Sequence, residues 1–221
     1  MFGKNPKRPS IISDGNSIFV QEIFPTIQGE GIFSGLPAIF VRLGGCNLAC
    51  SFCDTEFENF QEMQILDILN DIKKIKSIYS NINLIVITGG EPLRQNILKL
   101  FQLLDKNGYK IQIETNGTLY QDVPDFVSIM ASPKCINGKY TNIHPDLMSK
   151  VSALKFLISQ NLLGYDAIPD FVFDLKIPIF LQPMDELTHD KNNANNELTV
   201  KLSMQYGFRI SIQTHKILNI R

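Results

Sequence analysis

Residues 46–55 read CNLACSFCDT and hold three of the chain's four cysteines, spaced C-x3-C-x2-C. Thiolates are soft ligands that select zinc, copper(I) or iron–sulfur clusters. A structural zinc site takes four closed ligands, usually as two C-x2-C or Cys/His pairs, whereas this stretch has one such pair and one further cysteine. Three thiolates suit a 4Fe–4S cluster that leaves its fourth iron to a small molecule. The spacing therefore predicts an iron–sulfur site at Cys46, Cys50 and Cys53.

The composition is that of an ordinary globular protein rather than a disordered one, with 44% hydrophobic and 19% charged residues. We expect residues 1–221 to form a single domain, with residues 1–17 as an N-terminal arm whose basic tract, Lys4–Arg8, is a solvated tail. The net charge of −1 gives no reason to expect nucleic acid or an anionic membrane as a partner. Because the chain lacks an apolar run of about 18 residues and an N-terminal signal pattern, we expect no membrane span and a reducing, cytoplasmic location.

Short β-branched and aromatic runs alternate with helical periodicity along the chain. Strands are predicted over residues 17–24, 38–43, 84–88, 110–114, 126–130, 153–158, 179–182 and 209–213. Helices are predicted over residues 65–75, 97–104 and 197–206, with residues 190–196 as a polar loop. This alternation predicts an α/β fold with a parallel sheet, built as a barrel or part of one.

Most of the predicted strands end in a polar or glycine-rich tag. The tags are GG (44–45), TGGEP (88–92), ETNG (114–117), SPK (132–134) and QPMD (182–185). In parallel sheets, ligands bind at the carboxyl ends of the strands, so we expect the tags to converge on one site. The loop TIQGEG (26–31) lacks the pattern of a phosphate cradle.

Together with TIQGEG and with QTHK (213–216) near the C-terminus, these tags resemble the 7-carboxy-7-deazaguanine synthases. These are radical S-adenosylmethionine (SAM) enzymes of the queuosine precursor pathway. The resemblance covers residues 18–221; GGEP is shared by many radical SAM enzymes, whereas QGEG, Arg42, CDT and QTHK are more specific. It implies a partial (β/α) barrel of the radical SAM type with N- and C-terminal additions.

The resemblance implies that Cys46, Cys50 and Cys53 hold a 4Fe–4S cluster whose free iron chelates SAM. The implied SAM-binding residues are Phe52, Cys53, Asp54, Gly90, Glu91, Glu114, Asn116, Ser132, Pro133, Lys134, Gln182, Pro183, Met184 and Asp185. Family members also use Mg²⁺, a hard cation that keeps oxygen ligands and waters. Thr55 matches the position of its protein ligand.

The implied reaction is a radical carbon–nitrogen lyase reaction that converts 6-carboxy-5,6,7,8-tetrahydropterin to 7-carboxy-7-deazaguanine with loss of ammonia. An electron from the cluster cleaves SAM to methionine and a 5′-deoxyadenosyl radical, which takes a hydrogen from C6 of the pterin; SAM is then regenerated. The family also implies a homodimer and a separate electron donor.

The substrate positions that the resemblance implies include three expected catalytic residues, Glu30, Arg42 and His215. The full set is Ile27, Gln28, Gly29, Glu30, Arg42, Thr88, His215 and the α-carboxylate of Arg221. Arg42 offers a planar fork for the substrate carboxylate. The apolar residues Ile217, Leu218 and Ile220 predict that the C-terminal tail packs against the body of the protein.

Taken alone, several of these residues also fit plainer roles. Arg42 fits a surface arginine at a strand end, and Glu91 fits a cap of the helix that follows it. Thr55 fits an N-cap, and His215 fits a packed histidine. Cys135 lacks a partner cysteine, so we expect a buried or loop thiol without a metal role.

Two other functions remain open from the sequence. A glycyl-radical-enzyme activase of the radical SAM type shares the short cysteine spacing, but it leaves QGEG and QTHK without a use. A structural metal-binding module is the alternative that is not an enzyme. It predicts a colourless protein that holds zinc and does not bind SAM.

Replacing any one of Cys46, Cys50 or Cys53 with alanine should remove the cluster and abolish SAM cleavage, because each thiolate holds a different iron. Iron content and visible absorbance of the anaerobically reconstituted variants measure this loss. Cys135→Ala is the control and should leave both unchanged. Loss of iron from the Cys135 variant would show that the three-ligand assignment is wrong.

Overall fold

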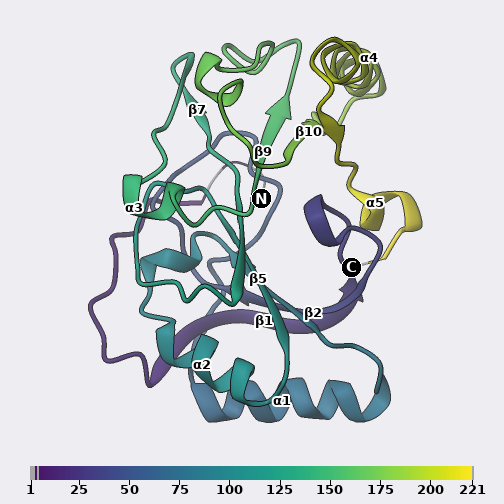
Figure 1. The fold of residues 1–221 in the computed structure, drawn as a ribbon. Helices are drawn as coiled ribbons and strands as arrows, with labels where there is room; N and C mark the ends of the chain where they lie inside the picture. Colours follow the sequence, from purple (N-terminus) through teal and green to yellow (C-terminus); the bar gives the residue numbers. More distant parts are fainter. Residues whose placement is uncertain (1–2, 4, 221) are drawn as a thin grey trace.

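The computed structural model describes residue 3 and residues 5–220, and its ribbon is drawn in Figure 1. The strands of its main sheet are β1 (Ser17–Ile27), β2 (Pro37–Leu43), β3 (Gln61–Gln64), β4 (Leu84–Gly89), β5 (Lys110–Thr115), β6 (Val127–Ala131), β9 (Ala153–Ile158), β10 (Ile179–Pro183) and β11 (Arg209–Ile210). The helices in the described part are α1 (Ile65–Ile78), α2 (Leu98–Lys106), α3 (Pro145–Met148), α4 (His189–Tyr206) and α5 (Thr214–Leu218). A separate hairpin pairs β7 (Cys135–Ile136) with β8 (Lys139–Tyr140).

Within the described residues the main sheet has nine strands, in the order β11-β10-β9-β6-β5-β4-β2-β1-β3. Every neighbouring pair from β2 to β11 is parallel, whereas β1 pairs antiparallel with both β2 and β3. The order is linear, so the sheet is an open part of a barrel rather than a closed one. The predicted α/β fold is thus confirmed, with β1 and β3 added at one edge, while α5, which follows β11 along the chain, contacts β1.

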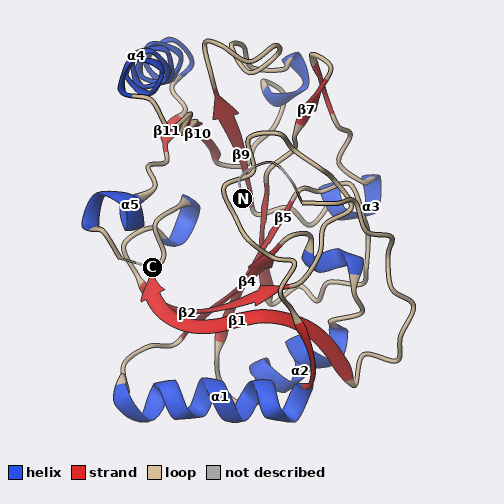
Figure 2. Cartoon of the chain, turned by 180° about the vertical axis from the view of Figure 1, so that it is seen from behind, coloured by secondary structure: helices blue, strands red, loops and turns tan. Residues whose placement is uncertain are grey.

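Two amphipathic helices, α1 and α2, contact each other on one face of the sheet, where α1 packs against β1 and α2 packs against β5 (Figures 1 and 2). The largest core cluster joins Ile72 of α1 and Phe101 of α2 to Ile85 and Ile87 of β4. Burying a side chain of this size contributes roughly 1.5–3 kcal/mol. The apolar stripe that predicts each helix therefore also attaches it to the outer face of the sheet.

The opposite face of the same strands carries a separate apolar layer, because side chains alternate along a strand. Ala38 of β2 packs with Leu84 and Val86 of β4, and Phe33 and Phe40 pack against them. Phe33 comes from a 3-10 turn (Gly31–Phe33) that follows β1. These residues form an apolar layer on the inner face, beneath the polar residues nearer the strand ends.

The predicted loop over residues 190–196 is wrong, because α4 already begins at His189. Asn195 is fully buried. Its side-chain amide donates to the Met184 carbonyl oxygen (2.8 Å) and to Glu186 Oε1 (3.0 Å), and its oxygen accepts from the Gln160 N–H (2.8 Å). These tertiary hydrogen bonds outweigh the low intrinsic helix propensity of asparagine.

Lys7 and Arg8 are exposed, as predicted for a solvated tail over Lys4–Arg8, but the arm is attached to the protein rather than free; Lys4 itself lies outside the described residues. The Gly3 N–H donates to the Cys53 carbonyl oxygen (3.0 Å), and the Arg8 N–H donates to the Cys46 carbonyl oxygen (2.7 Å). The backbone of the arm therefore lies against the cysteine loop. Composition alone misses this contact, because the bonds are made by the backbone.

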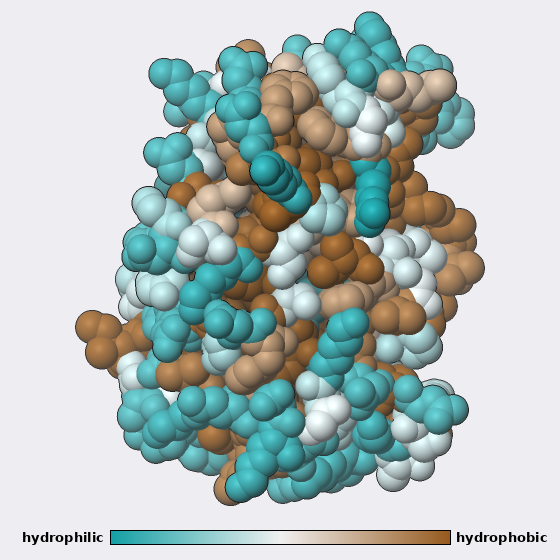
Figure 3. Space-filling model, viewed as in Figure 1, coloured by the Kyte–Doolittle hydropathy of each residue, from teal (hydrophilic) through white to brown (hydrophobic). Residues whose placement is uncertain are grey.

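The C-terminal tail also differs from its prediction. Ile217, Leu218 and Ile220 are 68%, 54% and 40% exposed rather than packed down. Figure 3 shows apolar side chains at the margin of the molecule where Figure 1 places α5. Contacts other than apolar burial must therefore hold this tail in place.

Across residues 3 and 5–220, no helix has both the length and the apolar character that crossing a membrane would require.

Replacing Asn195 with alanine should lower the free energy of unfolding by about 2–3 kcal/mol, because it leaves the buried partners of its amide unsatisfied. Asn196→Ala is the matched control, since Asn196 is exposed on the same helix and the two changes have the same effect on helix propensity. Urea unfolding of both variants measures the difference. Equal losses would show that the buried bonds do not hold α4 in place.

Candidate functional site

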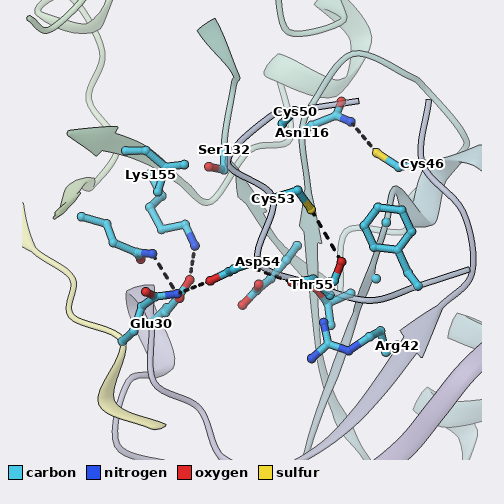
Figure 4. Close-up of a pocket in the computed structure, with 18 of the residues that line it drawn as sticks. Glu30, Arg42, Cys46, Cys50, Cys53, Asp54, Thr55, Asn116, Ser132 and Lys155 are labelled. Atoms are coloured by element: carbon cyan, nitrogen blue, oxygen red, sulfur yellow. Dashed lines mark hydrogen bonds and ion pairs between the residues drawn. The ribbon is translucent and has the colours of Figure 1, made fainter. Parts of the chain in front are cut away.

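A cavity of about 740 Å³ opens at the carboxyl ends of the parallel strands. Residues from four of the five predicted tags line it, and the GG tag (44–45) does not, although Cys46 directly after it does. The expected convergence is therefore confirmed for those four tags. The predicted site residues in its lining are Gln28, Glu30, Arg42, Cys46, Cys50, Phe52, Cys53, Asp54, Thr55, Thr88, Gly90, Glu114, Asn116, Ser132, Lys134, Gln182, Pro183, Met184, Asp185 and His215. Figure 4 shows ten labelled residues of the cavity, most of them from this set.

Some predicted residues do not line the cavity. Among those that the structure describes, these are Ile27, Gly29, Glu91 and Pro133. Gly29 instead packs against His215, since a Cβ added to Gly29 would come within 3.0 Å of His215 Nδ1. Arg221 lies outside the described residues, so the role of its carboxylate stays a prediction.

Two glycine pairs allow the ends of β2 and β4 to approach each other closely. A Cβ on Gly90 would lie 2.1 Å from the Gly45 carbonyl oxygen, which no real side chain could occupy. The same carbonyl accepts the Glu91 N–H at 3.0 Å. Gly45 has a φ of 74°, a conformation that glycine adopts without steric cost. The cysteine loop therefore starts at a fixed position against the TGGEP tag.

Glu91 joins two strand-end loops from behind the cavity. It is fully buried, and its Oε1 accepts from the Leu93 N–H (3.0 Å) and the Thr115 hydroxyl (2.7 Å), while its Oε2 accepts from the Asn116 N–H (2.7 Å). Burial raises the pKa of the Glu91 carboxyl, and these hydrogen bonds oppose that shift. The capping role that the sequence allows is present, because Glu91 caps the 3-10 turn Pro92–Arg94.

The cysteine loop presents Cys46, Cys50 and Cys53 to the cavity as free thiols. The Leu48 N–H donates to Cys46 Sγ (3.4 Å), and the Asn5 side-chain amide donates to Cys53 Sγ (3.7 Å). Such N–H donors stabilise the sulfur ligands of an iron–sulfur cluster. Burial raises the pKa of the Cys46 thiol to about 12, so a thiolate there needs a cation beside it.

Among the described residues, no three His, Cys, Asp or Glu side chains are grouped as they would be around one metal ion held by the protein alone. A cluster sets a different requirement, since each of its thiolates binds a different iron. Three free thiols on one short loop, with N–H groups directed at sulfur, fit that requirement.

An apolar wall adjoins the cysteine loop. Phe52 packs edge-to-face on Tyr165 with ring centroids 5.3 Å apart, and Met184 and Leu157 belong to the same cluster. The Tyr165 hydroxyl accepts from the Cys135 N–H at 2.7 Å. Cys135 is buried in this wall, in agreement with its prediction as a plain buried thiol. A flat apolar surface of this kind suits an aromatic ring.

A β-bulge places an acidic partner beside Arg42. The register of β1 against β2 shifts between Val20 and Glu22, and beyond this point Glu22 lies opposite Arg42. Arg42 Nε donates to Glu22 Oε1 at 2.8 Å, and both residues line the cavity. The Arg42 side chain is 18% exposed, so the alternative of an ordinary surface arginine is wrong. The sequence does not single out Glu22, because a bulge leaves no clear mark in the strand pattern.

A buried ion pair between Glu30 and Lys155 lies on another side of the cavity (Figure 4). The Glu30 and Lys155 side chains are 12% and 10% exposed, and Glu30 Oε1 also accepts from Gln182 Nε2 at 3.2 Å. Burial raises the pKa of Glu30, but the Lys155 ammonium outweighs burial and holds the pKa below its usual value of 4.5. Burial lowers the pKa of Lys155, and the Glu30 and Glu114 carboxylates more than reverse this.

Amide side chains extend this ion pair into a network. The Glu30 N–H donates to Gln28 Oε1 (3.1 Å), and Gln28 Nε2 donates to Glu114 Oε1 (2.8 Å). Gln112 Nε2 donates to the same Glu114 oxygen at 3.1 Å. The tags and motifs do not single out Lys155, although a lysine within the apolar run 153–158 is a usable signal that its side chain has a partner.

Comparisons with known proteins agree with this geometry. Residues 40–146 match the family model of the radical SAM superfamily. The chain is 53% identical to the 7-carboxy-7-deazaguanine synthase of Rickettsia prowazekii (strain Madrid E), over all of this chain and 96% of that protein. It is 36% identical to the protein of the same name from Rhodospirillum rubrum, over the full length of both. The crystal structure of QueE from Escherichia coli matches with a TM-score of 0.74 at 26% identity, covering 89% of this chain and 94% of that one.

Replacing Lys155 with methionine should destabilise the protein by about 3 kcal/mol or more at neutral pH, because it leaves the Glu30 carboxylate buried without its partner. In the variant, burial should raise the pKa of Glu30 above its unfolded value, so that the loss of stability grows as the pH rises from below 4.5. In the wild type the Glu30 pKa is lowered, so the ionised Glu30 stabilises the folded protein at neutral pH. This stabilisation is lost as the pH falls through the lowered pKa of Glu30. Urea unfolding between pH 4 and pH 8 compares the two proteins.

The double variant Lys155→Met with Glu30→Gln is the control, because it removes both charges. It should recover part of the stability and lose the added pH dependence. A single variant whose stability keeps the wild-type pH profile would contradict the importance of this ion pair.

Proposed function

Since the chain belongs to the 7-carboxy-7-deazaguanine synthase family of radical SAM enzymes, we propose that it converts 6-carboxy-5,6,7,8-tetrahydropterin to 7-carboxy-7-deazaguanine with loss of ammonia. The observation that carries this proposal is that one cavity is lined both by three free thiols and by a set of charged groups suited to a polar ring with a carboxylate. Its volume of about 740 Å³ is in the range that small-molecule sites occupy, roughly 300–1,000 Å³.

Membership of the radical SAM family implies a 4Fe–4S cluster and SAM as cofactors. We propose Cys46, Cys50 and Cys53 as the cluster ligands. When bound, the cluster supplies the electron that cleaves SAM for removal of a hydrogen atom from the substrate. Phe52 and the wall around it would receive the adenine, because that wall is apolar and includes a second aromatic ring.

The polar groups of SAM would meet the side chains on the neighbouring strand ends. Asn116 donates to Asn47 Oδ1 at 2.9 Å, which holds its amide beside the cysteine loop. Lys134 donates to the Ser132 hydroxyl at 2.7 Å, and burial lowers the pKa of this lysine. Glu91 would orient this region from behind, as a residue that positions the loops and does not touch the ligand.

Arg42 would bind the substrate carboxylate. Its Nε is engaged by Glu22, which leaves the two terminal nitrogen atoms of the guanidinium for a bidentate contact. The Glu30 carboxylate, kept ionised by Lys155, would accept hydrogen bonds from N–H groups of the pterin. His215, which packs on Gly29, would face the ring from the C-terminal side.

We also propose that Mg²⁺ binds at Thr55. This residue lines the cavity, and its hydroxyl donates to Asp54 Oδ1 at 3.3 Å. Mg²⁺ commonly keeps several waters and few protein ligands, so one protein oxygen is compatible with an ion held largely by substrate and water.

The remaining partners are inferred from the family. We propose a homodimer and a separate electron donor, and we expect neither nucleic acid nor a membrane to be a partner. Ala49 and Ser51 of the cysteine loop are exposed, which gives a donor a short approach to the cluster. The α-carboxylate of Arg221 would complete the pterin pocket.

Anaerobic incubation of the reconstituted protein with SAM, dithionite and carboxytetrahydropterin tests the proposal. Mass analysis should detect 7-carboxy-7-deazaguanine and ammonia release in many turnovers. Formation of 5′-deoxyadenosine without any deazaguanine would favour another radical SAM reaction, and the proposed substrate would then be wrong.

Arg42→Lys should weaken substrate binding by about 1.5–3 kcal/mol, the range of a hydrogen bond to a charged group. Lysine keeps the charge, but it lacks the rigid fork that can hold Glu22 and the substrate carboxylate together. Titration of the anaerobic protein with substrate measures the change, and SAM affinity should stay as in the wild type. Unchanged substrate affinity would argue against the carboxylate role of Arg42.

A further inference from the structure

Helix α5 borders the cavity and depends on polar contacts for its position. Each of its side chains is at least partly exposed, and a helix of five residues is too short to be stable alone. The Thr214 hydroxyl donates to the Gly29 carbonyl oxygen at 3.2 Å, which attaches the start of the helix to the loop after β1. The strongest charged contacts come from the middle of the helix, at Lys216.

Lys216 bridges two carboxylates from distant parts of the chain. Its Nζ lies 2.9 Å from Asp54 Oδ2 and 2.8 Å from Asp185 Oδ2. Asp54 follows the last cysteine of the loop after β2, whereas Asp185 lies two residues beyond β10. In the sheet, β4, β5, β6 and β9 separate β2 from β10. The bridge therefore crosses the cavity instead of following the sheet.

Because Lys216 balances the charge of two carboxylates, the bridge should stabilise the protein more than a single surface ion pair does. The Lys216 ammonium holds the pKa of Asp185 at about 2, and Asp54 is close enough to act on the Glu30 carboxyl electrostatically. Without Lys216, two carboxylates would face each other at the edge of a cavity that must accept the carboxylates of SAM and substrate. Networks of several charges contribute where isolated exposed pairs contribute little.

We infer that Lys216 is a positioning residue that fastens α5 across the cavity and holds the Asp54 and Asp185 loops at a fixed separation. Both loops belong to the proposed SAM pocket, and His215 is the neighbour of Lys216 on α5. One side chain thus couples the SAM side of the cavity to the substrate side. The statement about the substrate side rests on the proposed function, whereas the statement about the two loops does not.

The chain offers a matched control for this bridge. Lys191 pairs with Glu186, the neighbour of Asp185, at 3.5 Å, and the Lys191 side chain is 51% exposed. Lys191→Met removes one positive charge close to the same loop without touching the cavity lining. Lys216→Met removes the bridge, and Lys216→Arg keeps a charge that can bind both carboxylates.

Hydrogen–deuterium exchange of the protein without added cofactor tests the structural part. Lys216→Met should speed amide exchange over residues 211–218 and residues 54–57 while leaving β4 and β5 unchanged. Lys191→Met should match the wild type, and Lys216→Arg should restore most of the protection. Wild-type exchange in the Lys216→Met variant would overturn the inference.

Anaerobic binding and turnover of the reconstituted proteins test the coupling. Lys216→Met should bind SAM about three- to tenfold more weakly and should form more 5′-deoxyadenosine for each deazaguanine made. A Lys216→Met variant with wild-type SAM affinity and product ratio would overturn the coupling. If the wild type binds SAM but makes no deazaguanine, the proposed function is wrong. The amide hydrogen exchange and the SAM affinity of the Lys216 variants still decide the role of Lys216 in that case.

Discussion

The buried ion pair between Glu30 and Lys155 is the interaction on which the polar half of the cavity depends. It joins the loop after β1 to β9, two segments that are far apart in the sheet order. Two charges taken out of water cost several kcal/mol each, so they persist only because each is the other's partner and further hydrogen bonds satisfy Glu30. The amides of Gln28 and Gln182 extend the pair to β5 and β10. An ionised carboxylate is thereby held among largely buried side chains, where hydrogen bonds are stronger than in water.

The other half of the cavity is fixed by the backbone and by buried side chains behind it. Close contact between Gly90 and Gly45 sets where the cysteine loop begins, and Glu91 joins the loops after β4 and β5. The N-terminal arm then lies across the cysteine loop through backbone hydrogen bonds. The thiols are therefore positioned by contacts from three other segments, namely the loop after β4, the loop after β5 and the N-terminal arm. This arrangement leaves the cysteine loop exposed at Ala49 and Ser51 while its sulfur atoms line the cavity.

Much of this organisation follows from local sequence patterns, and the failures have physical causes. Strand runs and polar tags predict the parallel sheet and the convergence of the tags, because both depend on alternation and on strand direction. The start of α4 is missed because Asn195 is stabilised in the helix by partners from other segments. Glu22 is missed because a bulge sets it opposite Arg42, and Lys216 because its two partners lie about 30 and 160 residues away along the chain. The exposed residue Ile217 shows the reverse error, since an apolar side chain near the chain end need not be buried.

The central claim is that SAM, bound over the cysteine loop, and the substrate, bound over Arg42 and Glu30, share one cavity. The most direct measurement follows a hydrogen atom between them. The substrate is prepared with deuterium on C6, the carbon that carries the carboxylate, and is turned over anaerobically with unlabelled SAM. Mass analysis should then find deuterium in the adenosyl group of the recovered SAM or of 5′-deoxyadenosine. Deazaguanine formed without any deuterium in either molecule would contradict the claim.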